Sequence, residues 1–141
     1  MIRPYQEQDL NRLLEVWYSA SKIAHSFLDE AFLETERQNI PNVYLPAAKT
    51  WVFEQDNRVV GFISLLDEEV GAIFVEPQFQ RQGIGRALID WARTLRSQLF
   101  VEVFKENQIG RTFYEQYGFT PIDEHLHLET GYLLLRLRLK Y

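Results

Sequence analysis

Apolar and polar residues follow a helical spacing in the first third of the chain. The first apolar stripe, at spacings of three and four residues, is formed by Leu10, Leu13, Leu14 and Trp17. It predicts a helix with one buried side, and a second helix is expected over residues 29–38, ending before Pro41. Residues 19–28, between the two helices, have no clean period, so no regular element is predicted there.

Later apolar runs are short and rich in β-branched and aromatic residues, which predicts strands. The expected strands cover residues 1–3, 50–54, 59–66, 70–75, 99–104 and 133–140. Helices are expected over residues 86–95 and 107–117, and Gly118 is placed to end the second helix in a left-handed conformation. This order predicts an α/β (α+β) fold with helices against a mixed sheet. No repeat or linker interrupts the pattern, so residues 1–141 are expected to form a single domain.

Composition excludes several classes of protein. The chain is 46% hydrophobic with a net charge of −5, so it has material for a core and no basic excess for nucleic acid. It has no cysteine, which excludes disulfides, thiolate metal sites and cysteine nucleophiles. No apolar run reaches the roughly 18 residues of a membrane span, and the N-terminus lacks a signal-peptide core. We therefore expect a cytoplasmic domain without nucleic-acid or membrane partners.

The loop between the expected strand 70–75 and the expected helix 86–95 carries the clearest chemical signal. Residues 80–85 read Gln-Arg-Gln-Gly-Ile-Gly, so two glycines lie just before a helix begins. The first turn of a helix has unpaired N–H groups and a partial positive charge, and glycine lets an anion approach them. Arg81 and Arg86 can add charge-assisted hydrogen bonds. The pattern favours a phosphate site; the alternative is a loop whose glycines serve only tight turning.

Two common nucleotide motifs do not match this loop. A dinucleotide fingerprint needs a third glycine where Leu88 stands, and it should follow the first strand of the domain. A P-loop needs Lys and then Ser or Thr after the last glycine, whereas Arg86 follows Gly85.

The loop, preceded by Val75 and Pro77, resembles the acetyl-CoA pyrophosphate loop of the GCN5-related N-acetyltransferase (GNAT) family. A second segment of that family is present as Asn107, Arg111, Phe113, Tyr114, Gly118 and Phe119. The two segments occur in the expected order, with strand 99–104 between them. The resemblance implies a mostly antiparallel, twisted sheet of six to seven strands with about four helices on its faces. In that fold the sheet is splayed between strands 4 and 5.

The resemblance also implies where the ligands bind. The pantetheine arm of acetyl-CoA would lie along residues 73–75 like an added strand, and the pyrophosphate would reach the N–H groups of residues 81–86. The implied cofactor residues are Ile73, Phe74, Val75, Gln80, Arg81, Gln82, Gly83, Ile84, Gly85, Arg86, Asn107, Arg111 and Tyr114. Small bacterial members with a Trp…His-x-Phe segment are the most similar. Some of these acetylate protein lysines. The resemblance to their early segment implies that Trp17, His25 and Phe27 bind the acceptor.

The helix expected over residues 107–117 has two faces. Residues at spacings of four, expected to pack into the core, are Ile109, Phe113 and Tyr117. Asn107, Arg111 and Tyr114 share the other face, and Asn107 is also a natural N-cap. Gly110 lies beside that face, and an interior glycine costs a helix about 1 kcal/mol relative to alanine. A ligand passing close to the helix would explain the glycine.

Acyl transfer to an amine requires a proton acceptor, an oxyanion donor and a proton for the leaving thiolate. Tyr114 matches the tyrosine to which the family assigns the last role, as general acid. His25 and Glu102 are the favoured candidate bases, and Glu76 is a third. The alternative for each is an ordinary hydrogen-bonded or solvated side chain. No covalent enzyme intermediate is required.

His125, His127 and Glu129 alternate, which would place them on one face of a strand. Metal ligands normally come from separate elements that close around the ion. A solvated strand face is therefore favoured, and no metal is expected.

The leading hypothesis is an N-acetyltransferase that passes the acetyl group of acetyl-CoA directly to a primary amine in a sequential ternary complex. The acceptor would be a small-molecule amine or a peptide or protein lysine. The net negative charge of the chain modestly favours a cationic acceptor. The alternatives are a non-catalytic acyl-CoA-binding regulatory domain and an unrelated nucleotide-binding module. Either a monomer or a homodimer is compatible with the sequence.

Overall fold

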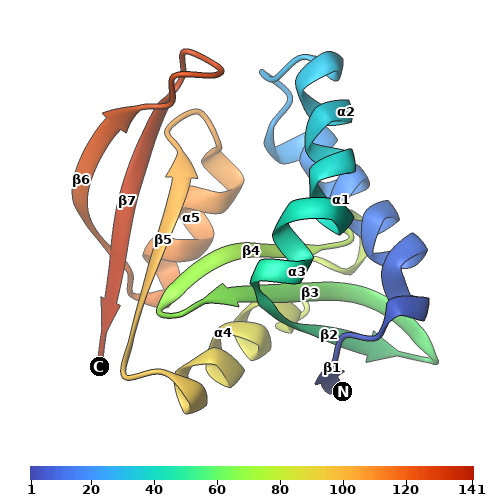
Figure 1. The fold of residues 1–141 in the computed structure, drawn as a ribbon. Helices are drawn as coiled ribbons and strands as arrows, with labels where there is room; N and C mark the ends of the chain where they lie inside the picture. The colour runs from blue at the N-terminus through green and yellow to red at the C-terminus, as the bar shows by residue number, and fades with distance from the viewer.

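Seven strands form one sheet in the order β1-β2-β3-β4-β5-β7-β6 in the computed structural model, which describes residues 1–141 (Figure 1). The strands are β1 (Ile2–Pro4), β2 (Lys49–Gln55), β3 (Arg58–Leu66), β4 (Glu69–Val75), β5 (Gln98–Phe104), β6 (Thr120–Leu126) and β7 (Leu133–Lys140). The α-helices are α1 (Leu10–Ala24), α2 (Glu30–Asn39), α3 (Leu45–Ala47), α4 (Ile84–Leu95) and α5 (Gln108–Tyr117). No helix is both long enough and apolar enough to cross a bilayer.

The pairing between β4 and β5 is parallel, and every other pairing in the sheet is antiparallel. The parallel pairing of β4 with β5 comprises only two residue pairs, Glu69 with Phe100 and Val70 with Val101. Beyond these pairs the two strands diverge: in Figure 1, β5 runs steeply upward while β4 runs across the view. The mixed sheet with a splay between strands 4 and 5 is therefore confirmed.

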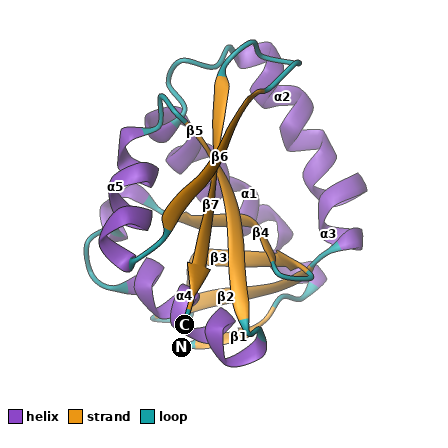
Figure 2. Cartoon of the chain, turned by 90° about the vertical axis from the view of Figure 1, so that its left-hand side faces the viewer, coloured by secondary structure: helices purple, strands orange, loops and turns teal.

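Helices cover both faces of the sheet. One core contains Leu88 and Ile89 of α4 with Tyr114 of α5, and the other contains Leu13 of α1 and Leu33 of α2. Figure 2 shows α4 and α5 on one side of the sheet and α2 and α3 on the other. The interior of β3 is buried throughout because both cores pack against it, which explains its nearly continuous apolar sequence.

The first helix is longer than predicted. It continues to Ala24, through most of the segment that shows no period. Its buried positions there are Ala20 and Ser21, which are too small or too polar to register as an apolar stripe. After α2 the chain passes Pro41 in a π-helical turn, η2 (Ile40–Tyr44), because a proline in the first turn of a helix lacks only a donor that would be unpaired anyway.

Strand β6 was not predicted. All of its residues are exposed, since it forms one edge of the sheet and packs under no helix. An edge strand of this kind has no buried face and therefore no apolar alternation to detect. The hairpin between β2 and β3 was predicted, and its turn residues Asp56 and Asn57 have φ of 54° and 63°, as a type I′ turn requires.

A buried ion pair joins α1 to the end of β4. Arg12 binds Glu76, which is only 6% exposed, so the interpretation of Glu76 as a solvated carboxylate is wrong. Glu76 does not line the cleft between β4 and β5, and its pairing with Arg12 opposes a role as the base. The same guanidinium donates to the carbonyl of Val59 at 2.8 Å and to Glu15 at 3.0 Å. This pair fixes α1 over the strand that leads into the glycine loop.

Replacing Glu76 with Gln removes the charge that compensates Arg12. We expect Glu76→Gln to lower the free energy of unfolding by about 3 kcal/mol, as for other broken buried pairs, measured by urea denaturation. Glu34→Gln is the matched control, because Glu34 is exposed on α2 and forms no ion pair. Equal midpoints for the two variants would show that the Arg12–Glu76 pair does not stabilise the fold.

Candidate active site

A cleft of about 1010 Å³ opens where β4 and β5 part. It extends from the glycine loop and α5 on one face of the sheet to α1, α2 and η2 on the other. A ligand on either face can therefore reach the same gap between the strands.

The backbone of residues 81–86 presents free donors to the cleft. No N–H group in this segment donates to the protein, and the first helical bond of α4 is that from Ala87 N–H to the carbonyl of Gly83. Arg81 and Gly83 have φ of 64° and 87°, which turns the chain sharply before the helix. Gln80 fixes the loop to the sheet, since its Nε2 donates to the carbonyl of Val75 at 2.9 Å.

The two glycines of the loop are required for different physical reasons. A Cβ on Gly83 would meet nothing within 4 Å, so its positive φ is what requires glycine. A Cβ on Gly85 would lie 3.0 Å from Cε1 of Phe113. Gly85 therefore lets α4 approach α5, whereas the sequence indicated only the approach of an anion or a tight turn.

The predicted cofactor residues around this loop are only partly brought together. Arg81 and Arg86 line the cleft, and the Arg86 guanidinium lies 4.9 Å from the centre of the Tyr117 ring. Arg111 does not line it, because its Nη1 donates to the carbonyl of Lys105 at 3.0 Å. The side chain of Gln82 turns back toward the carbonyl of Gln78, and that of Ile84 is buried in the core.

Strand β4 has a free edge on the cleft. Ile73, Phe74 and Val75 pair with β3 on one side and with no strand on the other. Backbone amides and carbonyls along such an edge need partners, and a chain of amides can supply them. All three residues line the cleft, as predicted for the pantetheine site.

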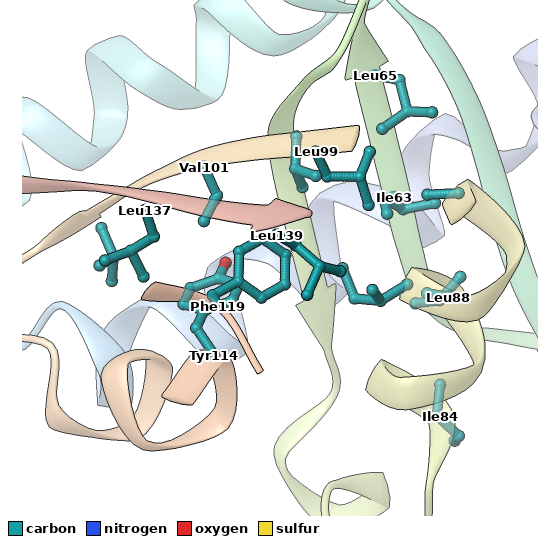
Figure 3. Close-up of a cluster of buried hydrophobic side chains, with 14 of the residues drawn as sticks. Ile63, Leu65, Ile84, Leu88, Leu99, Val101, Tyr114, Phe119, Leu137 and Leu139 are labelled. Atoms are coloured by element: carbon teal, nitrogen blue, oxygen red, sulfur yellow. The ribbon is translucent and has the colours of Figure 1, made fainter. Parts of the chain in front are cut away.

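Tyr114 is buried, and its hydroxyl reaches the cleft. The residue is 7% exposed and packs against Phe113 and Phe119, with ring centroids 5.3 Å away in each case (Figure 3 shows it beside Phe119). The Tyr114 hydroxyl forms no hydrogen bond within the protein, and it is not among the fully enclosed unpaired polar atoms, which are those of Ser21 and Trp91. Since Tyr114 lines the cleft, its hydroxyl is open to the cleft. Burial raises the pKa of Tyr114 above its usual value, so at neutral pH it remains a proton donor.

The predicted faces of α5 are only partly right, since Phe113 and Tyr117 pack against the core as expected. Tyr114 is the buried residue of the helix, whereas Ile109 is 47% exposed. The space at Gly110 is filled by Asn107, since a Cβ there would lie 2.6 Å from the Asn107 Nδ2. The glycine is therefore explained by the capping side chain, without a ligand.

The two favoured candidate bases lie in different surroundings. The His25 ring is packed among aromatic rings, and its Nε2 lies 3.3 Å from Nδ2 of Asn107. Burial lowers the pKa of His25 to about 4. Glu102 is exposed on β5, lines the cleft and has Oε2 at 3.0 Å from Nε2 of His125.

The side of the cleft formed by α1, α2 and η2 contains residues that the sequence pattern did not indicate. Glu36 of α2 and Tyr44 of η2 line it, and the Tyr44 hydroxyl donates to Oε1 of Glu36 at 2.9 Å. Burial raises the pKa of Glu36, and burial and this carboxylate raise that of Tyr44 to about 12. No local motif marks these residues, because the packing of α2 brings them to the site. Of the predicted acceptor residues, Trp17 lines the cleft and Phe27 does not, since it packs against Tyr132 beneath the β6–β7 hairpin.

The charges of the cleft are separated by sign. Arg81 and Arg86 line it at the glycine loop, and Glu36, Glu102 and Glu129 are the acidic residues that line it elsewhere. The cleft is therefore basic where a phosphate would bind and acidic on the opposite side.

No group of three or more His, Asp or Glu side chains is arranged to hold a metal ion. His125 faces Glu102, whereas Nδ1 of His127 lies 2.8 Å from Oγ1 of Thr130. The alternating histidines thus have separate partners.

Comparison with known proteins agrees with this geometry. A family model described as "Acetyltransferase (GNAT) domain" matches residues 46–121. The peptidyl-lysine N-acetyltransferase YiaC of Escherichia coli is 32% identical over 124 residues, which is 87% of this chain and 85% of YiaC. The peptidyl-lysine N-acetyltransferase YjaB of Salmonella typhimurium is 32% identical over 84% of this chain and 81% of its own.

Solved structures show the same fold. The solution structure of apo YjaB from E. coli superposes with a TM-score of 0.86 at 27% identity, covering 99% of this chain and 96% of that one. The PaiA N-acetyltransferase of Thermoplasma acidophilum, crystallised with coenzyme A, has a TM-score of 0.80 at 19% identity, covering 100% and 98%. With the family model, the relatives and the splayed sheet in agreement, the chain belongs to the GNAT family of acetyl-CoA-dependent acetyltransferases.

Proposed function

We propose that this enzyme transfers the acetyl group of acetyl-CoA to the ε-amine of a peptide or protein lysine, with both substrates bound together. The observation that carries the proposal is the convergence on one cleft of the free donors of residues 81–86, the unpaired edge of β4 and the Tyr114 hydroxyl. Its relatives YiaC and YjaB are named as peptidyl-lysine N-acetyltransferases, which supports the choice of lysine.

Acetyl-CoA would bind along one face of the splay. Its pyrophosphate accepts from the N–H groups of residues 81–86 at the start of α4, where the helix dipole favours negative charge. Arg81 and Arg86 add positive charge at that end. The amides of its pantetheine arm pair with the free edge at residues 73–75, which directs the thioester into the gap between β4 and β5.

The chemistry follows from the groups around that gap. The lysine nitrogen attacks the thioester carbonyl, and an N–H group on the free edge of β4 stabilises the oxyanion. The bond to sulfur then breaks, and the departing thiolate takes a proton from Tyr114. The nitrogen, which still carries one proton too many for an amide, releases it to the resulting Tyr114 phenolate directly or through water. The ammonium of lysine, with an ordinary pKa of about 10.4, must lose a proton before attack. Glu102, on the acceptor side, takes that proton directly or through water.

The separated charges support a cationic acceptor. A lysine side chain approaching from the α2 side meets Glu36, Glu102 and Glu129 and no opposing positive side chain along the cleft wall. A field of this sign raises the local concentration of cations and the rate of encounter. Basic residues next to the target lysine would benefit from the same field.

Removing the Tyr114 hydroxyl tests the chemical step. We expect Tyr114→Phe to lower kcat by about 100-fold, the usual contribution of a general acid, with the Kd for acetyl-CoA within about twofold of wild type. Free thiol release with lysine peptides measures turnover, and calorimetry measures binding. Tyr117→Phe is the control, because that hydroxyl is engaged with Asp90 on the surface. Equal kcat values for the two variants would remove Tyr114 from the mechanism.

A charged side chain at Gly83 tests the anion site. Gly83→Glu forces a residue into a positive φ and places a carboxylate beside the free N–H groups, so we expect acetyl-CoA binding to be lost in calorimetry. Gly131→Glu is the matched control, because Gly131 also has a positive φ (76°) and a Cβ there would meet nothing within 4 Å. Gly131 lies in the turn between β6 and β7. Binding by both variants would refute the assignment of the loop. Binding without thiol release by wild-type protein would instead indicate a regulatory acyl-CoA-binding domain.

A further inference from the structure

The His25 ring lies where β4 and β5 separate. Its centroid is 6.3 Å from that of Phe74 on β4 and 5.4 Å from that of Phe104 on β5, with interplanar angles of 85° and 76°. The two strands share no hydrogen-bonded pair at these residues. The imidazole therefore bridges the splay by edge-to-face contacts, a favoured geometry for aromatic rings.

The hydrogen bond made by His25 has a fixed direction. Oδ1 of Asn107 accepts from the N–H group of Gly110 at 2.9 Å, so the amide nitrogen of Asn107 is the group that faces His25. An amide nitrogen only donates, and Nε2 of His25 must accept. The neutral ring then carries its proton on Nδ1.

This arrangement leaves His25 without a site for another proton. The lone pair of Nε2 is engaged by Asn107, and Nδ1 already bears a hydrogen. The surrounding groups are Phe27, Phe74, Phe104 and the Asn107 amide, none of them charged, and their low polarity favours the neutral ring. The geometry opposes the earlier interpretation of His25 as a general base.

We propose that His25 is a positioning residue, which acts through Asn107 to hold the first turn of α5, and with it Tyr114, against the free edge of β4. The connection runs from the C-terminus of α1, where His25 is the cap residue, to Asn107, the buried N-cap of α5. Asn107 in turn holds the N–H group of Gly110 in the turn that precedes Tyr114. The role in catalysis rests on the proposed function, whereas the connection itself does not.

Two substitutions at residue 25 separate positioning from proton transfer. Phenylalanine preserves the ring contacts and removes the acceptor, whereas glutamine supplies an acceptor oxygen and cannot serve as a base. We expect His25→Phe to lower kcat by roughly 10- to 100-fold, as small displacements of a catalytic group do, with a smaller change in the KM for acetyl-CoA. His25→Gln should recover about tenfold of that loss, with the pH–rate profile of wild type. If glutamine is as inactive as phenylalanine and the acidic limb of the profile disappears, His25 is the base and the proposal is wrong.

A double-mutant cycle with Asn107→Ala tests the route of the effect. If His25 acts through Asn107, the loss of kcat caused by His25→Phe should largely disappear in the Asn107→Ala background. A full, additive loss there would overturn the proposal.

Hydrogen exchange of the Gly110 amide gives a readout that needs no turnover. We expect its exchange to quicken by about tenfold in His25→Phe and to slow again in His25→Gln, while amides of α4 stay unchanged. Unchanged exchange at Gly110 in His25→Phe would refute the connection. An absence of thiol release by the wild-type protein would refute the proposed function, and the exchange result would still decide whether His25 holds α5.

Discussion

The early end of the pairing between β4 and β5 is the constraint on which the site depends. Two residue pairs join the strands, and the sheet is then open. The opening leaves β4 with unpaired amides, gives His25 a place between Phe74 and Phe104, and connects the two faces of the sheet through one cleft. In the proposed ternary complex the two substrates approach from opposite faces and meet inside the sheet, which a fully paired sheet would prevent.

Three glycines around the cleft show how one residue type satisfies separate demands. Gly83 turns the chain at a positive φ, Gly85 admits the ring of Phe113 between α4 and α5, and Gly110 leaves room for the amide of Asn107. Only the first of these demands belongs to the anion loop itself. The other two place α5 against the loop and against its own cap, so the position of Tyr114 depends on glycines that make room for protein side chains.

The sequence was sufficient where the requirement is local. The glycine loop and the capping by Asn107 were predicted because turn and cap chemistry is carried by adjacent residues. The splay of the mixed sheet was expected only from the resemblance to the GNAT family. The orientation of α5 was predicted only in part: Phe113 and Tyr117 pack against the core as expected, but the ring of Tyr114 also fills a core position and Ile109 remains exposed. Strand β6 has no buried face to produce a pattern. The position of Glu36 in the cleft depends on how α2 packs, which no spacing along the chain encodes.

The separation of charge along the cleft gives the proposed reaction a direction. An incoming lysine is drawn toward the carboxylates of Glu36, Glu102 and Glu129 because it is a cation. The amine gives up its charge before it attacks, and acetylation prevents the charge from returning, so the neutral amide product is no longer attracted. The spent cofactor keeps its phosphates and stays held at the arginine end. Modified peptide would thus depart first, and the enzyme would suffer little inhibition from the acetyl-lysine it makes.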